Sequence, residues 1–216
     1  MRGALDTTAM QSLFPERGEV SVAGMWDLST RRRHGDRPWI VMCMISSADG
    51  AIHLDGSAAA LGGPIDKELF LHLHRTADSV LVGAGTVRAD GYHPLPPGRN
   101  LYVVSRTGNL GPHAAELRAA SNTHVVAGDV SDIVRRIEGN VCALEGGSQL
   151  NAQMLAAGLV DEVSLTIAPR FVGSVSDRVA SGPPAAREPW QLVRVCEGDD
   201  GFLFMRYVRS GAVVPS

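Results

Sequence analysis

Two glycine-rich junctions have the residue types and the spacing that can hold a phosphate. The apolar run Ser79–Val82 leads into Gly83–Asp90 (GAGTVRAD), and Val141–Leu144 leads into Glu145–Leu150 (EGGSQL). Glycines at a strand-to-helix turn let backbone N–H groups approach an anion, and the N-terminus of the next helix adds partial positive charge. Each junction alone is also typical of an ordinary turn, and Arg88 occupies the third glycine position of the dinucleotide fingerprint. Two such corners in one small α/β domain predict a clamp on a dinucleotide diphosphate.

A third segment offers further phosphate ligands. Arg99 precedes the apolar run Leu101–Val104, and Ser105 and Arg106 follow it. A guanidinium fork beside a hydroxyl suits the 2′-phosphate of NADPH, whereas NADH favours a carboxylate at its ribose. Solvated arginines at a strand end are the alternative.

Two aspartates are candidates for catalysis or substrate contact. Asp49 follows the apolar run Trp39–Ser46, at a strand end where α/β sheets place ligands and general acids, although Asp-Gly there often forms only a turn. Asp66 falls in the first turn of a predicted helix, Pro64–Thr76, where the helix dipole alone would favour a carboxylate. It shares a stripe with Phe70, so it can face a pocket.

The sequence predicts no metal site. The three cysteines are far apart in apolar runs without a C-x-x-C pattern, which predicts free buried thiols: Cys43, Cys142 and Cys196. His72 and His74 fall on different sides of a helix, and three other histidines stand alone in the sequence: His53, His93 and His124.

Alternating strands and helices must position these residues. Apolar runs predict strands at 39–46, 79–83, 101–105, 124–127, 141–145 and 162–169, and helices are expected at 64–76, 113–120, 131–137 and 148–157. This order is typical of βαβ units around a largely parallel sheet. Residues 190–196 and 202–208 flank a glycine-containing turn and predict an antiparallel hairpin. The proline-rich stretch 174–189 predicts a surface excursion.

Length and composition indicate a globular chain of one domain or at most two small ones. The chain has 216 residues, 44% of them hydrophobic, and a formal net charge of −3, which argues against non-specific binding to nucleic acid or to a membrane surface. Residues 1–37 show little periodicity and predict an irregular arm or leader with a solvated Arg31–Arg33 run, followed by one domain over 38–210. No apolar run is long enough to span a bilayer and no signal peptide is recognisable, so we expect a cytoplasmic protein.

Taken together and in this order, the segments 46–50 (SSADG), 83–90 and 145–147 resemble the reductase domain of the riboflavin-biosynthesis enzymes, over about Trp39 to Val208. The resemblance implies the dihydrofolate-reductase-like α/β fold, with three layers (α/β/α) around a mostly parallel mixed sheet and a C-terminal antiparallel hairpin. It also implies NADPH-dependent reduction of a ribosylaminopyrimidine 5′-phosphate to its ribitylamino product, by a homodimer. A dihydrofolate or pterin reductase and a non-catalytic NADPH-binding module are the alternatives.

By this resemblance, one set of residues lines the cofactor: Ser46, Gly83, Gly85, Thr86, Val87, Arg99, Ser105, Arg106, Glu145, Gly146, Gly147, Ser148, Gln149 and Leu150. A second set contacts the substrate, with Asp49 or Asp66 supplying the catalytic carboxyl: Ser47, Asp49, Asp66 and Asp90. Two departures fall on the expected substrate side. Ala51 stands where many relatives carry a basic residue, and Gly91–His93 replaces an acidic pair and a proline. The zinc deaminase motifs of the bifunctional members are absent from the sequence.

Overall fold

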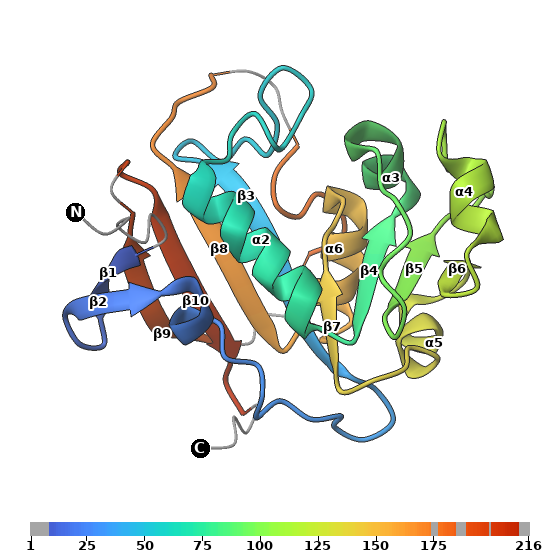
Figure 1. Ribbon diagram of the computed structural model, residues 1–216, viewed down its shortest axis with the longest axis horizontal. Coiled ribbons are helices and arrows are strands. Elements are labelled where there is room, and N and C mark those ends of the chain that lie inside the picture. The colour runs from blue at the N-terminus through green and yellow to red at the C-terminus, as the bar shows by residue number, and fades with distance from the viewer. Residues whose placement is uncertain (1–8, 174–176, 185–188, 199, 212–216) are drawn as a thin grey trace, which may run out of the picture.

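A computed structural model describes residues 9–173, 177–184, 189–198 and 200–211, and it builds their strands into one ten-stranded sheet (Figure 1). The strands are β1 (Ala9–Phe14), β2 (Gly18–Ser21), β3 (Trp39–Ser47), β4 (Ser79–Gly83), β5 (Asn100–Val104), β6 (Thr123–Val126), β7 (Val141–Leu144), β8 (Glu162–Ala168), β9 (Trp190–Glu197) and β10 (Leu203–Arg209). The helices are α1 (Val22–Met25), α2 (Pro64–Thr76), α3 (Ala84–Asp90), α4 (Ala114–Ala119), α5 (Val130–Arg135) and α6 (Ser148–Ala156). From residue 39 onward, the strands and helices predicted from the sequence are confirmed to within two residues at each end.

The sheet has a parallel part and an antiparallel part. Its order is β2-β1-β9-β10-β8-β3-β7-β4-β5-β6. The six strands from β8 to β6 pair in parallel, and β10, β9, β1 and β2 pair antiparallel at the other end. The predicted hairpin is therefore confirmed as β9–β10, and β3 lies in the middle of the sheet.

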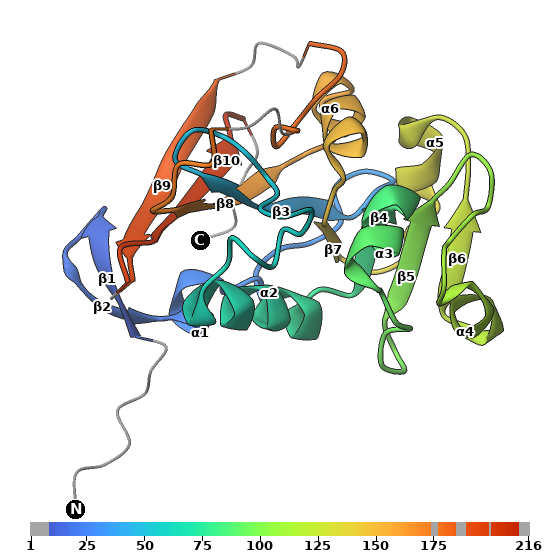
Figure 2. The ribbon, with the colours of Figure 1, turned by 90° about the horizontal axis from the view of Figure 1, so that it is seen from above.

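Helices cover both faces of the sheet. Helices α1 to α4 lie on one face, and α5 and α6 lie on the other (Figure 2). One apolar core fills the space under α1 to α4 and a second fills the space under α5 and α6. The three-layer α/β/α arrangement that the resemblance implied is confirmed. None of the helices in the described part of the chain has the length and apolar character needed to cross a membrane.

Helix α2 carries the first of the predicted site residues. Gly63 is its N-cap and Pro64 occupies the first turn, where a missing N–H costs nothing. The buried side chains Ile65, Leu69 and Leu73 recur every four residues and face the sheet. The adjacent stripe, Asp66, Phe70 and His74, is therefore half-buried along the edge of this contact.

The expected irregular arm is wrong for residues 9–25. These residues form β1, β2 and α1, and β1 pairs with β9 and so extends the sheet. Met10, Met25 and Trp26 are at most 1% exposed and belong to the core beneath α2. Elements of four to six residues are too short to show a period in the sequence. Residues 1–8 of the predicted arm lie outside the described residues. The same holds for residues 174–176 and 185–188 of the predicted surface excursion. Its described residues 177–184 contain neither helix nor strand.

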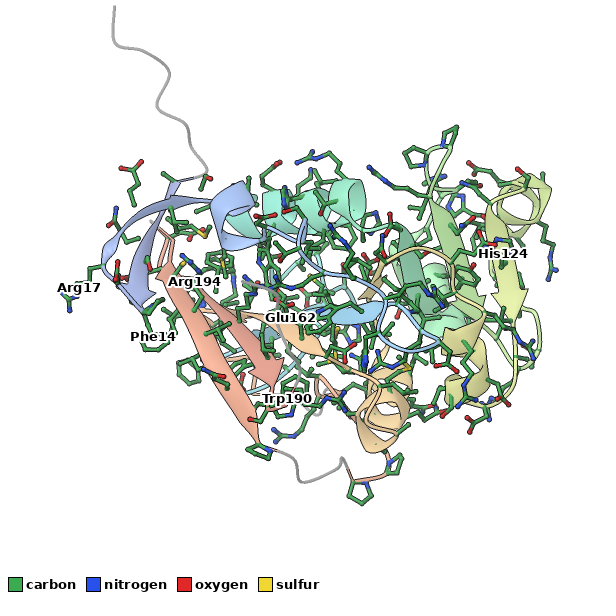
Figure 3. The ribbon with its side chains drawn as sticks, turned by 90° about the horizontal axis from the view of Figure 1, so that it is seen from below. Phe14, Arg17, His124, Glu162, Trp190 and Arg194 are labelled. Atoms are coloured by element: carbon green, nitrogen blue, oxygen red, sulfur yellow. The ribbon has the colours of Figure 1, made fainter. Side chains whose placement is uncertain are left out.

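The arginine run is solvated only in part, because Arg32 is exposed and Arg33 is half-buried. Arg31 is only 4% exposed and pairs with Glu162, whose side chain lies in the interior beside the segment that leads to β3 (Figure 3). Arg37 makes two hydrogen bonds to Asp161, at 2.6 and 2.8 Å, and Arg206 and Arg209 add further ion pairs to these two carboxylates. This buried network fastens residues 31–37 to β8 and β10.

The three cysteines are free, as predicted, and lie in β3, β7 and β9. Cys142 and Cys196 are buried, whereas Cys43 is half-buried below α2.

Candidate active site

The two glycine corners meet at the carboxyl edge of the parallel sheet. Strands β4 and β7 are neighbours, so both chains leave the sheet at the same edge. The Gly83 N–H donates to the Gly146 carbonyl at 2.6 Å. A Cβ on Gly83 would lie 3.2 Å from the Gly147 nitrogen, and a Cβ on Gly147 would lie 3.1 Å from Thr86 Oγ1. The predicted approach of residues 83–86 to residues 145–148 is confirmed, and a side chain at either glycine would crowd the contact.

The corners also bring two helix N-termini together. Gly83 is the N-cap of α3 and Gly147 is the N-cap of α6, and neither has a side chain that could cap the first N–H groups. The peptide between Gly146 and Gly147 is cis. Gly85 and Gln149 are exposed at the start of these helices. Backbone donors at two adjoining helix starts form a site suited to a diphosphate.

Some predicted cofactor residues face the core instead. Val87 is 1% exposed and packs beneath α3, and Leu150 is 6% exposed and packs beneath α6 on the opposite face of the sheet. Ser148 is buried and its carbonyl accepts the Ser181 N–H at 3.1 Å. The side chains of Val87 and Leu150 therefore do not line a cofactor, which corrects the sequence-based assignment.

Arg99 and Ser105 lie at opposite ends of β5. Arg99 precedes the strand and donates to the His74 carbonyl at 2.9 Å. Ser105 follows the strand at the carboxyl edge, and its hydroxyl accepts the Gly108 N–H. The intervening residues, at about 3.3 Å each, separate the two by about 20 Å. Arg99 therefore cannot share a 2′-phosphate with Ser105, whereas the exposed Arg106 remains a predicted partner for it.

Asp49 organises a loop. Its two carboxylate oxygens accept the N–H groups of Val172 and Gly173, and the Ser47 hydroxyl donates to it at 2.5 Å. These hydrogen bonds lower the pKa of the Asp49 carboxyl to about 2, so Asp49 is an anion at neutral pH and cannot act as a general acid there. Ser47 is 1% exposed and also accepts the Ala51 N–H, which argues against the predicted substrate contact. Ser46 is likewise buried, at the end of β3.

Asp66 has the opposite environment. Burial raises the pKa of the Asp66 carboxyl, and a hydrogen bond from Thr166 on β8 partly offsets that rise. Helix α2 packs across the sheet, so the Asp66 carboxyl faces the strands. Of the two aspartates, Asp66 is the one whose pKa is raised above the ordinary value, so it is the better candidate for a proton donor.

A cluster of polar side chains lies between α2 and the carboxyl end of β7. The Tyr92 hydroxyl donates to Glu145 Oε2, and His74 Nε2 lies 2.5 Å from Glu145 Oε1. The Phe70 ring stacks on His74 with centroids 4.3 Å apart. Burial, followed by the charge of Glu145, raises the pKa of Tyr92 well above its ordinary value. Burial raises the pKa of Cys43 in the same way, and the charges of Glu145 and Asp66 add to the shift, so these groups lie within electrostatic reach of one another.

The role predicted for Glu145 changes accordingly. Its backbone N–H donates to Leu81, but its side chain is 6% exposed and turns toward α2, away from the diphosphate corner. The sequence missed His74 and Tyr92 as site residues. His74 could have been predicted, because it follows Asp66 by eight positions and therefore lies on the same stripe of the helix. For Tyr92, the sequence showed only that residues 91–93 depart from the family pattern. Asp90, at the end of α3, is exposed near His53, and its predicted substrate contact stays a prediction.

A groove of about 420 Å³ lies elsewhere, at the amino end of β7 between α1 and α2, and is lined by residues such as Asp27, His72 and Asn140. It is separated from the carboxyl edge by the length of the parallel strands, so it does not belong to this site.

Residues 38–204 match the model of the RibD C-terminal domain family. The chain belongs to this family. A curated RibD-type relative, the 2,5-diamino-6-ribosylamino-4(3H)-pyrimidinone 5′-phosphate reductase of Methanothermobacter thermautotrophicus, is 32% identical over 174 residues, which are 63% of this chain and 80% of the relative.

Solved structures show the same fold. A pyrimidine reductase-like protein from Corynebacterium diphtheriae superposes with a TM-score of 0.67 at 22% identity, covering 87% of this chain and 96% of that protein. Dihydrofolate reductase from Enterococcus faecalis, complexed with NADP(H), superposes with a TM-score of 0.57 at 18% identity over 80% of this chain and 96% of the enzyme. RibD of Acinetobacter baumannii gives a TM-score of 0.70 at 16% identity, with 82% of this chain and 59% of RibD covered. The dihydrofolate-reductase-like fold predicted for this RibD-type chain is confirmed.

Proposed function

We propose that this protein reduces a ribosylaminopyrimidine 5′-phosphate to the ribitylamino product, with NADPH as the reductant. The observation that carries the proposal is the meeting of two uncapped glycine corners beside a half-buried carboxyl of raised pKa on α2. Membership of the RibD C-terminal domain family and the 32% identical pyrimidinone phosphate reductase support the choice of substrate.

The residues of the glycine corners fit a dinucleotide. A Cβ on Gly83 or Gly147 would meet an atom of the other corner at 3.1 to 3.2 Å, so glycine lets the two helix starts lie close enough to share one diphosphate. The N-termini of α3 and α6 would hold the diphosphate, and Ser105 with Arg106 would hold the 2′-phosphate. Bound NADPH supplies a hydride to an electrophilic carbon.

Asp66 supplies the proton. Reduction of a ring-opened substrate adds a hydride to C1′ and a proton to the attached nitrogen. Burial raises the pKa of Asp66 and so favours its protonated form, whereas three hydrogen bonds hold Asp49 ionised. Asp66 is therefore the general acid in this proposal, and Asp49 is a positioning residue that holds the loop after β8 against the end of β3.

The cluster of His74, Tyr92 and Glu145 orients the substrate. The Tyr92 hydroxyl and His74 hold Glu145 from two sides, which fixes the position of its carboxylate. Fixed polar groups lower the entropic cost of aligning the substrate with the reductant. Position 51 is alanine, so it contributes no basic side chain to the contacts with the phosphorylated sugar.

The test is direct. Purified full-length protein with the ribosylaminopyrimidine phosphate should consume NADPH in proportion to product formed, and NADPH should raise Tm more than NADH at equal concentration. Absence of turnover across a pyrimidine and pterin panel, with NADPH still bound, would favour the non-catalytic module. Tight methotrexate binding enhanced by NADPH would favour a pterin reductase.

A homodimer and a cytoplasmic location remain predictions. Sedimentation of the purified chain and fractionation of cells would check them.

A further inference from the structure

Three potential metal ligands meet on the surface near α4, at a place that the sequence did not single out. Among the residues that the structure describes, one group of this kind offers ligand atoms that all lie within 4.8 Å of one another: His93, His113 and Glu116. His93 lies in the loop after α3, and the other two lie twenty residues later, at the N-cap and in the first turn of α4. In the sequence His93 stands alone, because its two partners lie at least twenty residues further along the chain.

The spacing of these atoms fits a small metal ion. His93 Nδ1 lies 3.0 Å from Glu116 Oε2, and His113 Nδ1 lies 3.8 Å from the same oxygen. Bonds of about 2.1 Å in a tetrahedral zinc site place neighbouring ligand atoms about 3.4 Å apart. The two measured separations lie on either side of that value, so small side-chain rotations suffice to bring three ligands onto one ion.

The surroundings suit a metal with open coordination positions. The three side chains are between 36% and 61% exposed, which leaves room for the ion and for water in its remaining positions. The other edge of the His113 ring faces the chain at Gly91, where a Cβ would lie 3.6 Å from Nε2. Nδ1 is therefore the His113 nitrogen turned toward Glu116. Two imidazoles and one carboxylate suit zinc and neighbouring divalent transition metals better than Mg²⁺ or Ca²⁺.

We infer that His93, His113 and Glu116 form a binding site for a divalent transition metal of the zinc class. The ion joins the loop after α3 to the start of α4. Because His93 directly follows Tyr92, whose hydroxyl donates to Glu145, the bound ion also restrains the backbone beside the candidate active site. This inference does not depend on the proposed function, since it concerns binding alone.

The experiment is a ZnCl₂ titration of untagged, EDTA-treated full-length protein with reduced thiols, followed by calorimetry. The wild-type protein should bind one ion saturably. Glu116→Gln should weaken binding by at least about tenfold, the loss typical of disturbing a metal site, and the double variant His93→Ala/His113→Ala should abolish it. His124→Ala is the matched control, because His124 lies on β6 outside the group (Figure 3), and it should bind zinc like the wild type.

Hydrogen exchange gives a second readout that locates the ion. Zinc should slow exchange in residues 91–95 and 113–117 of the wild-type protein and leave the double variant unchanged. Zinc binding of equal strength in the wild type and the double variant, through the thiols for example, would overturn the inference. So would the absence of saturable binding in the wild type.

Discussion

At the scale of single residues, two aspartates show how the surroundings set the chemistry of one side chain. Asp49 is exposed and accepts three hydrogen bonds, which hold its pKa at about 2. Asp66 is half-buried, and desolvation raises its pKa. The first is therefore a permanent anion that orders a loop, and the second can hold and release a proton.

Asp66→Asn should slow NADPH oxidation by about 10²- to 10⁴-fold, the usual contribution of a general acid, while NADPH affinity stays unchanged. In the wild type, the rate should fall as pH rises through the raised pKa, because the carboxyl then loses its proton. Steady-state kinetics over a pH series checks both. Glu68→Gln on the same helix, which removes only a surface partner of Arg75, is the control. An unchanged rate of NADPH oxidation in Asp66→Asn would show that Asp66 is not the general acid.

The same variant should be more stable than the wild type at neutral pH. Burial disfavours the ionised carboxyl in the folded state, and asparagine removes that cost. The folded-state pKa is raised, so the wild type gains stability as pH falls and the difference in Tm should disappear below the ordinary aspartate range. Thermal melts at pH 3 and pH 8 test this sign.

Asp49→Asn should lower stability at neutral pH and lose its effect in acid. The folded pKa lies below the ordinary value of 3.8, so the stabilisation is complete above that value and is lost as pH falls toward 2. Tm measured for both proteins between pH 6 and pH 2 should converge at the acid end. A difference in Tm that stays constant over this pH range would show that ionisation of Asp49 does not contribute to stability through its hydrogen bonds to residues 172 and 173.

At the scale of elements, the site depends on two strand-to-helix turns that touch through their backbones. β4 and β7 pair in parallel, which brings Gly83 against Gly146 and Gly147. The neighbours of a Gly83 side chain would be backbone atoms, which cannot move without shifting a strand.

Gly83→Ala should therefore destabilise the protein by about 1–3 kcal/mol, as overpacking does, and weaken NADPH binding at least tenfold. Gly18→Ala is the matched control, since nothing lies within 4 Å of its Cβ position. Denaturant unfolding and NADPH titration of both variants measure the two effects. Wild-type NADPH affinity in Gly83→Ala would contradict the placement of the diphosphate.

At the scale of the whole molecule, the family match begins at residue 38, yet the folded unit begins earlier. Residues 9–37 add two strands, part of the core and two arginines that reach Asp161 and Glu162. Both carboxylates are fully buried, so the arginines are required to compensate their charge.

Arg37→Ala should cost about 3–5 kcal/mol of stability, because it leaves Asp161 buried with only part of its compensation. Arg135→Ala removes an exposed pair with Asp36 and should cost about 1 kcal/mol or less. Urea unfolding of both variants measures the two losses in the free energy of unfolding. Equal, small losses would show that Asp161 does not need Arg37, since Arg209 and His34 also lie beside its carboxylate.

The sequence by itself determined the order of strands and helices, the parallel sheet with its closing hairpin, and the two glycine corners. These features depend on local patterns of apolar residues and glycines, which a short window of sequence contains. It also placed Asp66 beside an apolar stripe on a helix.

Only the tertiary structure decided which aspartate has a raised pKa and which side chains join Glu145. It also decided that residues 9–25 belong to the sheet and that His93 lies beside α4. Burial, pKa and ligand distance depend on atoms that come from segments tens of residues apart. No local pattern carries that information, because it arises only when the strands pair and the helices pack across them.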